Sequence, residues 1–352
     1  MLLDRNELIT THETLSNLIG CPGHEEEVAN FILSNIEDHV DEAWRDPLGN
    51  VLAKKEGTRS TGKKILLDAH IDEVGFMVNH IDENGFLRVD ALGGIDKRVM
   101  LGQMVQFQSD TGETVVGIVG SQPPHTTKKE EREKVPEIRD MFIDVGCDSD
   151  EEVREKGLHV GTVGTFYTKF KQLDGDTLIG KAFDDRTACN VLIHVLKLLS
   201  KANTEHTILA NFAAQEEVGG RGAKVGAFEL KSDIALALEN TIASDVPDVS
   251  PSKVVTTLGN GPAITAADKS LITPPRILTR LKKAAERDNI QWQYKKPTYG
   301  GTDAGRIALT RSGVPSGVVS VPCRYIHGPV GLLKVDDLVD TIRLVKNFCT
   351  IP

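Results

Sequence analysis

The sequence predicts an α/β protein in which an all-β insertion interrupts an α/β domain. Short apolar runs alternate with amphipathic helical patterns near both ends of the 352-residue chain. That alternation is typical of a sheet with helices on both faces. Between them, strand-like segments are separated by turn sequences such as DENG and SDTGE, which predict hairpins. We therefore expect an α/β domain made of residues 1–72 and 164–352, and a small β-barrel or sandwich at 73–163.

The N-terminal part of the α/β domain begins with two predicted helices, at 5–20 and 24–38, which a Cys-Pro-Gly break separates. Acidic residues at 25–27 suit the positive first turn of the second helix. Residues 64–69, KILLDA, form an apolar run without alternation. This run predicts a strand that is buried on both faces.

The insertion contains two predicted hairpins and a further strand at 141–146. Ser149 and Glu152 have the spacing of a capping box, and Gly157 is placed to end the short helix that they predict. The mixed-charge segment 125–134 is expected to be a surface loop. The later α/β domain is predicted to contain helix 185–201, strands 207–214 and 233–239, helix 275–287, strand 290–294, helix 303–311, strand 316–321 and helix 335–348.

The composition limits the function class. The net charge of −10 argues against nucleic-acid binding, because contact with phosphates needs a basic face. No apolar run approaches the roughly 20 residues that span a bilayer, and the N-terminus lacks the apolar core of a signal peptide. The five cysteines are odd in number and widely spaced, which favours free thiols in a reducing compartment. We expect a cytoplasmic protein without a membrane partner.

Two segments carry candidate ligands at predicted element boundaries. His70 and Asp72 follow the buried strand, where a carboxylate can orient a metal-binding imidazole; a solvated strand end is the simpler reading. Asp184 and Asp185 open a predicted helix, which N-capping alone would explain. One of these two carboxylates could instead bridge two cations while the other pairs with Arg186.

Three further strands end near acidic or imidazole side chains. Glu216 and Glu217 follow an apolar strand and precede a Gly-Gly pair that allows close approach of a ligand. A solvated acidic loop is the simpler reading, but one Glu could bind a metal while the other faces the substrate as general base. Glu239 and His327 also follow apolar strands. Taken alone, each would be read as an ordinary loop residue and not as a ligand. Together, these oxygen and imidazole donors without thiolates suit Zn²⁺, Co²⁺ or Mn²⁺ in a hydrolytic site.

These segments resemble the glutamyl or deblocking aminopeptidases, metallopeptidase family 42, whose members form tetrahedral shells. The resemblance implies a zinc-peptidase-like α/β sandwich with an inserted β-barrel dimerisation domain and two divalent ions per subunit. It also implies peptide substrates and a homo-oligomer in which dimers assemble into a dodecamer. The matching blocks, in order along nearly the whole chain, include AHIDEVGFMV, LGGID, FIDVG, GKAFDDR, AAQEEVGGRGA, LGNGPAI, GGTDA and RYIHGP.

Carried over position by position, the resemblance assigns roles to individual residues. Glu216 would be the general base, and Asp72 would orient the imidazole of His70. The residues expected at the two metal ions are Asp184 as the bridge, His70 and Glu239 at one ion, and Glu217 and His327 at the other.

Two positions depart from the family pattern. Many members have Asp at the position of Glu239 and Ser at the position of Gly328. The longer Glu keeps the charge but changes the reach of the ligand, which bears on metal choice and occupancy. The run from Glu239 to Thr241 resembles a subgroup of frv-operon-type proteins, for which the class of enzyme is better defined than the substrate.

Two other functions fit part of the pattern. An endoglucanase-like glycosidase could use a carboxyl pair about 5–9.5 Å apart, and some relatives carry cellulase labels, but it needs no histidines at strand ends. A non-catalytic metal-binding shell protein would keep the scaffold, although every expected catalytic position is filled. We therefore expect a dinuclear-metal aminopeptidase that releases the N-terminal residue of peptides, with Zn²⁺ or Co²⁺ preferred over Mn²⁺.

Overall fold

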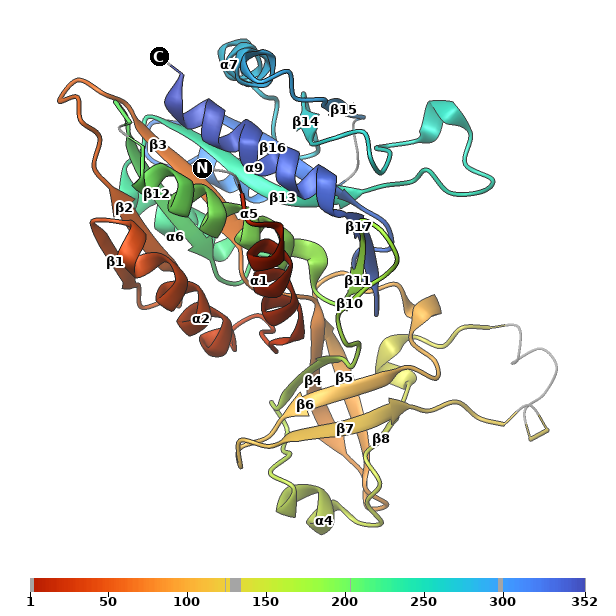
Figure 1. Cartoon of the computed structure of the whole chain (residues 1–352). Coiled ribbons are helices and arrows are strands. Elements are labelled where there is room, and N and C mark those ends of the chain that lie inside the picture. The colour runs from red at the N-terminus through yellow and green to blue at the C-terminus, as the bar shows by residue number, and fades with distance from the viewer. Residues whose placement is uncertain (1–2, 124, 127–133, 203, 297–299, 352) are drawn as a thin grey trace.

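An α/β domain and a smaller β-barrel make up the molecule (Figure 1). This arrangement confirms the predicted fold class, an α/β protein with an inserted barrel. The barrel strands lie between Gly75 and Phe166, and the division of the chain at 72/73 and 163/164 stays a prediction. Most of the expected surface loop at 125–134 lies outside the described residues. The computed structural model describes residues 3–123, 125–126, 134–202, 204–296 and 300–351.

The main sheet has eight strands within the described residues, in the order β1-β2-β12-β3-β13-β16-β14-β15. Its four central strands, β12, β3, β13 and β16, run parallel. They are almost wholly buried, as expected for apolar runs without alternation. The strand bounds are β1 Glu42–Arg45, β2 Val51–Lys55, β3 Lys64–His70, β12 Thr207–Ala213, β13 Ile234–Ile242, β14 Ala263–Thr265, β15 Gln293–Lys295 and β16 Ser316–Cys323.

Helices cover both faces of this sheet. One face carries the largest apolar core, and the opposite face packs against two short helices that are rich in small residues. The helices of the first face are α1 Arg5–Asn17, α2 Glu26–Ile36, α5 Phe183–Ser200, α7 Pro275–Arg287 and α9 Val335–Thr350; those of the second are α6 Arg221–Leu230 and α8 Asp303–Ala308.

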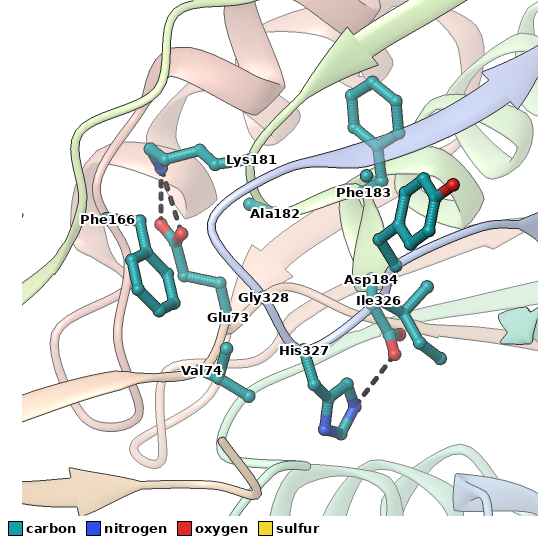
Figure 2. Close-up of a pocket in the computed structure, with 12 residues that line it drawn as sticks. Glu73, Val74, Phe166, Lys181, Ala182, Phe183, Asp184, Ile326, His327 and Gly328 are labelled. Atoms are coloured by element: carbon teal, nitrogen blue, oxygen red, sulfur yellow. Dashed lines mark hydrogen bonds and ion pairs between the residues drawn. The ribbon is translucent and has the colours of Figure 1, made fainter. Parts of the chain in front are cut away.

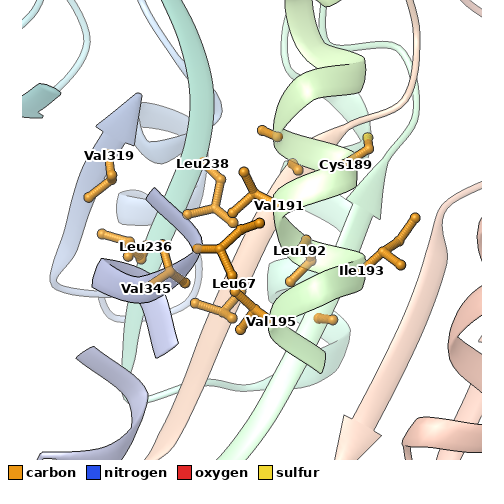
Figure 3. Packing of buried hydrophobic residues seen from close by; sticks show 14 of the residues in the cluster. Leu67, Cys189, Val191, Leu192, Ile193, Val195, Leu236, Leu238, Val319 and Val345 are labelled. Atoms are coloured by element: carbon orange, nitrogen blue, oxygen red, sulfur yellow. The ribbon is translucent and has the colours of Figure 1, made fainter. Parts of the chain in front are cut away.

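The core between α5 and the sheet follows from helical spacing in the sequence. Val191 and Val195 lie four residues apart on α5, so both point toward Leu67 of β3 (Figure 3). All three side chains are fully buried. Each contributes about 1.5–3 kcal/mol relative to an exposed position. This packing holds the strands rigidly, and their carboxyl ends carry the candidate site.

The barrel closes in the order β4-β5-β8-β7-β6-β9 around its own apolar core. Phe76 and Phe166 meet edge to face inside it, with ring centroids 5.3 Å apart. The predicted capping box is present in part, because Ser149 Oγ accepts the backbone N–H of Glu152 at the start of α4, Asp150–Glu155. The barrel strands are β4 Gly75–Ile81, β5 Phe86–Leu92, β6 Met104–Gln108, β7 Thr114–Val119, β8 Ile143–Asp144 and β9 Val163–Phe166.

Several elements were not predicted from the sequence. The antiparallel pair β1 and β2 forms an edge of the main sheet, and helix α6 covers β12. A separate three-stranded sheet joins β10 Lys171–Gln172, β11 Thr177–Gly180 and β17 Gly331–Lys334. These elements are short or rich in glycine, so their hydrophobic periodicity is weak.

All five cysteines are buried and free, which matches the expectation of unpaired thiols. Among the residues that the structure describes, no helix has both the length and the apolar character needed to cross a bilayer.

Candidate metal centre

The predicted site residues converge where the parallel strands end and the barrel begins. His70 is the last residue of β3, and the turn that carries Glu216 and Glu217 follows β12 directly. The loop that carries His327 follows β16. Because parallel strands present their carboxyl ends at one edge, residues from distant parts of the sequence meet there.

Asp184 lies between the two histidines. Its Oδ1 is 3.3 Å from His70 Nε2, and its Oδ2 is 3.0 Å from His327 Nε2. Figure 2 shows the imidazole of His327 directed at the Asp184 carboxylate. A carboxylate with one oxygen toward each imidazole has the form of a bridging ligand.

Asp184 belongs to one compact donor group and contacts a second one through His70. Within each group the possible ligand atoms lie within 4.8 Å of one another. A third group consists of His70 and the two glutamates of the turn after β12, and its possible ligand atoms also lie within 4.8 Å of one another. The first two groups are His70, Asp185 and Glu239, and Asp184, Glu217 and His327.

The Asp184–Asp185 pair does not act as a helix cap. A kink divides α5 at the two aspartates, which both have non-helical backbone angles, and among the described contacts neither carboxylate accepts a backbone N–H of α5. The Asp185 carboxylate accepts the backbone N–H of His70 at 3.3 Å. Arg186 donates to the carbonyl groups of Ile71 and Leu15, so the expected pairing between Asp185 and Arg186 is wrong.

Asp72 connects the end of β3 to the glutamate turn. Its Oδ1 accepts the backbone N–H of Glu216 at 2.9 Å, and its Oδ2 accepts that of Glu217 at 3.0 Å. His70 Nδ1 lies 3.1 Å from the Asp72 carbonyl oxygen and 3.5 Å from Oδ1 of the same residue. Asp72 therefore contacts both His70 and the turn, and its closest contact with the imidazole is through the backbone.

Glu239 lies inside β13, three residues before the strand ends at Ile242, whereas the sequence placed it at the strand exit. Glu239 still reaches the site because the neighbouring strand β3 ends earlier, at His70. Glu239 Oε2 is 4.0 Å from His70 Nε2. The other oxygen accepts the backbone N–H of Asp303 at 3.2 Å. Asp303 is the first residue of α8 and belongs to the GGTDA block of the family resemblance.

The barrel contributes a contact that sequence reasoning missed. His327 Nδ1 lies 2.8 Å from the carbonyl oxygen of Gly94, in the loop after β5. Gly93 packs so closely against Glu217 that an added Cβ would come within 2.9 Å of the Glu217 carboxylate. The glycines of LGGID were the available signal, because glycine permits this approach.

A second polar cluster lies beside the site (Figure 2). Lys181 Nζ is 2.7 Å from Glu73 Oε1, and Arg186 lies 3.5 Å from the same oxygen. All three side chains are at most 2% exposed. The cluster was not predicted, since nothing in the local sequence pairs residues so far apart.

Burial controls the electrostatics of the donor set. It raises the pKa of Glu217 to about 8 and that of Glu239 well above its usual value. Burial alone would lower the pKa of His327, but the hydrogen bond with Asp184 raises it to about 10. The protein thus holds more carboxylates than imidazoles in a place where negative charge is costly.

The donor set fits divalent metal ions. Within the described part of the chain, the buried Glu217 Oε1 has no hydrogen bond and only a 3.5 Å contact with His327 Nε2, and the Glu217 side chain is 5% exposed. Cations would satisfy this oxygen and neutralise the surrounding carboxylates. Nitrogen and oxygen donors without thiolate suit Zn²⁺, Co²⁺ or Mn²⁺.

A parallel α/β sheet with this donor set at its carboxyl edge, joined to a barrel that touches the set, defines a metallopeptidase-type hydrolase. Residues 49–344 match the model of the M42 glutamyl aminopeptidase family. The chain belongs to this family and is a metal-dependent aminopeptidase.

Individual relatives agree with the family. Lysyl aminopeptidase of Pyrococcus furiosus is 33% identical, over 93% of this chain and 92% of the relative. An aminopeptidase structure from the archaeon Desulfurococcus kamchatkensis superposes with a TM-score of 0.94 at 37% identity, covering 99% of this chain and 96% of that one. The TET1 peptidase of Pyrococcus horikoshii, which can assemble into a tetrahedron or a large octahedral shell, gives 0.86 at 28% identity, covering 98% and 100%.

Proposed function

We propose that two divalent ions bind this chain on either side of Asp184, and that the site removes the N-terminal residue of peptides. The position of the Asp184 carboxylate between two imidazoles carries the proposal. The proposed ligands are Asp184 as the bridge, His70 and Glu239 for one ion, and Glu217 and His327 for the other.

Zn²⁺ or Co²⁺ is the proposed metal, with Mn²⁺ as a further candidate. When bound, such ions lower the pKa of water toward about 7 and act as Lewis acids toward a carbonyl oxygen. Glu239 has a longer arm than the Asp of many relatives, and its second oxygen accepts an N–H from Asp303. We therefore expect Glu239 to influence which metal is retained.

Glu216 is the proposed general base. Its backbone is fixed by Asp72, and its side chain belongs to a donor group with His70 and Glu217. Glu216 would take the proton of the attacking water as the new C–O bond forms. It would then give that proton to the amine nitrogen as the C–N bond breaks. Buried carboxylates around the site would hold the free α-amine of the substrate, which favours action at the N-terminus.

Replacing Glu216 tests this role. We expect Glu216→Gln to retain two metal ions per chain and to lose turnover by about 10²–10⁴-fold, because the amide cannot accept the proton. Metal content by mass spectrometry and kcat on an aminoacyl-anilide measure the two effects. A variant with wild-type turnover would remove Glu216 from the mechanism.

Metal removal tests the reaction class. We expect complete chelation to abolish release of N-terminal residues, and separate addition of Zn²⁺, Co²⁺ or Mn²⁺ to restore it to different extents. A panel of unblocked aminoacyl-anilides and short peptides would identify the preferred residue in the same experiment. Glycoside hydrolysis that survived chelation would contradict the proposal, as would two bound ions without peptidase activity.

We also propose that the chain forms a homo-oligomer in the cytoplasm, in which dimers assemble into a dodecamer. The similarity to the shell-forming TET1 peptidase of Pyrococcus horikoshii supports such an assembly. On the barrel, Met104, Val116 and Ile118 expose apolar side chains on neighbouring strands β6 and β7. The free, buried cysteines are compatible with a reducing compartment.

A further inference from the structure

The turn that carries the proposed general base is held from outside by side chains. Its four consecutive backbone N–H groups, at residues 214–217, all donate to side-chain oxygens of three residues from other segments. The contacts are Ala214 N to Asn50 Oδ1 at 2.8 Å, Gln215 N to Glu25 Oε1 at 3.1 Å, Glu216 N to Asp72 Oδ1 at 2.9 Å and Glu217 N to Asp72 Oδ2 at 3.0 Å.

Glu25 occupies the critical position in this arrangement. It accepts the N–H of Gln215, the residue just before Glu216, and Gln215 has a left-handed φ of 59°. That conformation costs a non-glycine residue on the order of 1 kcal/mol and persists only where contacts enforce it. The same Glu25 oxygen accepts the N–H of Gly23 at 2.8 Å, which ties the turn to the segment before α2.

Glu25 differs from the other two acceptors in its access to solvent. Asn50 and Asp72 are fully buried, and Asn50 cannot ionise. Glu25 is 5% exposed and borders a surface pocket of about 500 Å³. Among the three acceptors, Glu25 is therefore both ionisable and within reach of protons from water.

The surroundings of Glu25 oppose its ionisation. Burial raises its pKa to about 7, and the nearby charge of Asp72 acts in the same direction, whereas the N–H groups of Gly23 and Gln215 favour the ionised form. The ionisable groups that share its pocket are His24 and Glu26 beside it in the chain, and Arg45 and Asp46 from the segment at the end of β1.

We propose that Glu25 is a positioning residue whose carboxylate aims Glu216 and Glu217 by holding Gln215, and whose protonation loosens this hold. The effect on catalysis rests on the proposed function, whereas the effect on the turn does not. Hydrogen bonds to an ionised acceptor are roughly twice as strong as neutral ones, so the charged form fixes the turn more firmly.

Glu25→Gln is the matched probe, because the amide keeps the shape and one acceptor oxygen but never carries the charge. We expect kcat/KM of the variant to equal that of the wild type near about pH 6, where Glu25 is protonated, and to be about tenfold lower near pH 8.5. Taking the ratio of variant to wild type at each pH cancels the titration of every group that the substitution leaves unchanged. The exposed neighbour Glu26→Gln is the control, and its ratio should not vary with pH.

Two outcomes would overturn the proposal. A Glu25→Gln ratio that is reduced equally at every pH would indicate a merely structural role, and a ratio of one throughout would indicate none. Glu25→Asp serves as a second variant, because it keeps the charge on a shorter side chain. Its kcat/KM should be lower than that of the wild type, but its dependence on pH should remain.

Amide hydrogen exchange of the metal-free protein provides a test that needs no turnover. At matched pH near 8.5, peptides that cover 214–217 should exchange several-fold faster in Glu25→Gln than in the wild type or Glu26→Gln, and the difference should vanish near about pH 6. If the wild type lacked peptidase activity but this difference appeared, the proposed function would fail and the role of Glu25 would stand. Unchanged exchange in an active enzyme would refute the role of Glu25 alone.

Discussion

His12 lies in the core of the α/β domain, and among the described residues neither of its ring nitrogens has a hydrogen-bond partner. It packs against Phe183 and Phe170, with ring centroids 4.7 and 5.7 Å away. Burial lowers its pKa to about 3, so the folded protein keeps this imidazole neutral. Because Phe183 precedes Asp184 directly, the packing of His12 also supports the start of the metal centre.

The stability of the protein should therefore depend on pH through His12. The unfolded chain binds a proton at this residue near pH 6.5, whereas the folded protein does so only near 3. The contribution of neutral His12 to the free energy of unfolding is therefore fully present above about pH 6.5. It is lost as the pH falls toward 3, at up to about 1.4 kcal/mol per pH unit. We expect His12→Leu to reduce this slope in urea unfolding between about pH 7 and 5. Parallel pH dependences of variant and wild type would show that His12 does not contribute.

At the scale of elements, the Glu73–Lys181–Arg186 cluster joins the barrel to the α/β domain. Glu73 lies on the segment that leads from β3 into the barrel, and Thr165 of β9 donates to it at 2.9 Å. Lys181 lies between β11 and α5, just before the aspartates of the site. The carboxylate of Glu73 therefore contacts both the last strand of the barrel and the segment that leads into α5.

Removing one partner of this cluster should destabilise the junction. We expect Lys181→Met to reduce the free energy of unfolding by about 3–5 kcal/mol, because it leaves the buried charge of Glu73 without its closest cation. Chemical denaturation would measure the loss, and the double variant Lys181→Met/Glu73→Gln should recover much of it. A loss below about 1 kcal/mol would mean that Arg186 and the hydrogen bonds to Glu73 suffice without the lysine.

At the scale of the whole molecule, the proposed assembly needs a contact surface, and we place it on the outer face of the barrel. Met104 and Ile118 are paired across β6 and β7 and are 45% and 51% exposed. Contiguous exposed apolar side chains are a feature of association surfaces.

A charge on this surface should weaken assembly. We expect Ile118→Glu to shift the protein toward smaller species in light scattering after size exclusion, because burying the carboxylate in an interface is costly. Lys63→Glu also adds a carboxylate, but in the α/β domain, and should not alter the assembly. An unchanged mass for Ile118→Glu would place the association surface elsewhere.

Local sequence patterns were sufficient to predict the α/β class, the insertion and the central strands. They suffice there because a strand such as β3 is buried on both faces whatever its neighbours are. The same patterns located the candidate ligands, since charged residues such as Glu216 and Glu217 directly after an apolar strand need a special reason. The family resemblance supplied the expected roles of these residues, and those roles stay predictions.

How these residues face one another follows from tertiary contacts that no local pattern contains. The orientation of Asp184, the carbonyl group of Gly94 and the carboxylate of Glu25 depend on contacts between segments that are distant in the sequence. Helix α6 escaped prediction for the same reason: its Gly226 lets the helix approach Asn211 of β12 so closely that an added Cβ would lie 2.6 Å from that side chain. Such contacts are set by packing across layers, whereas hydrophobic periodicity reports only which face of one element is buried.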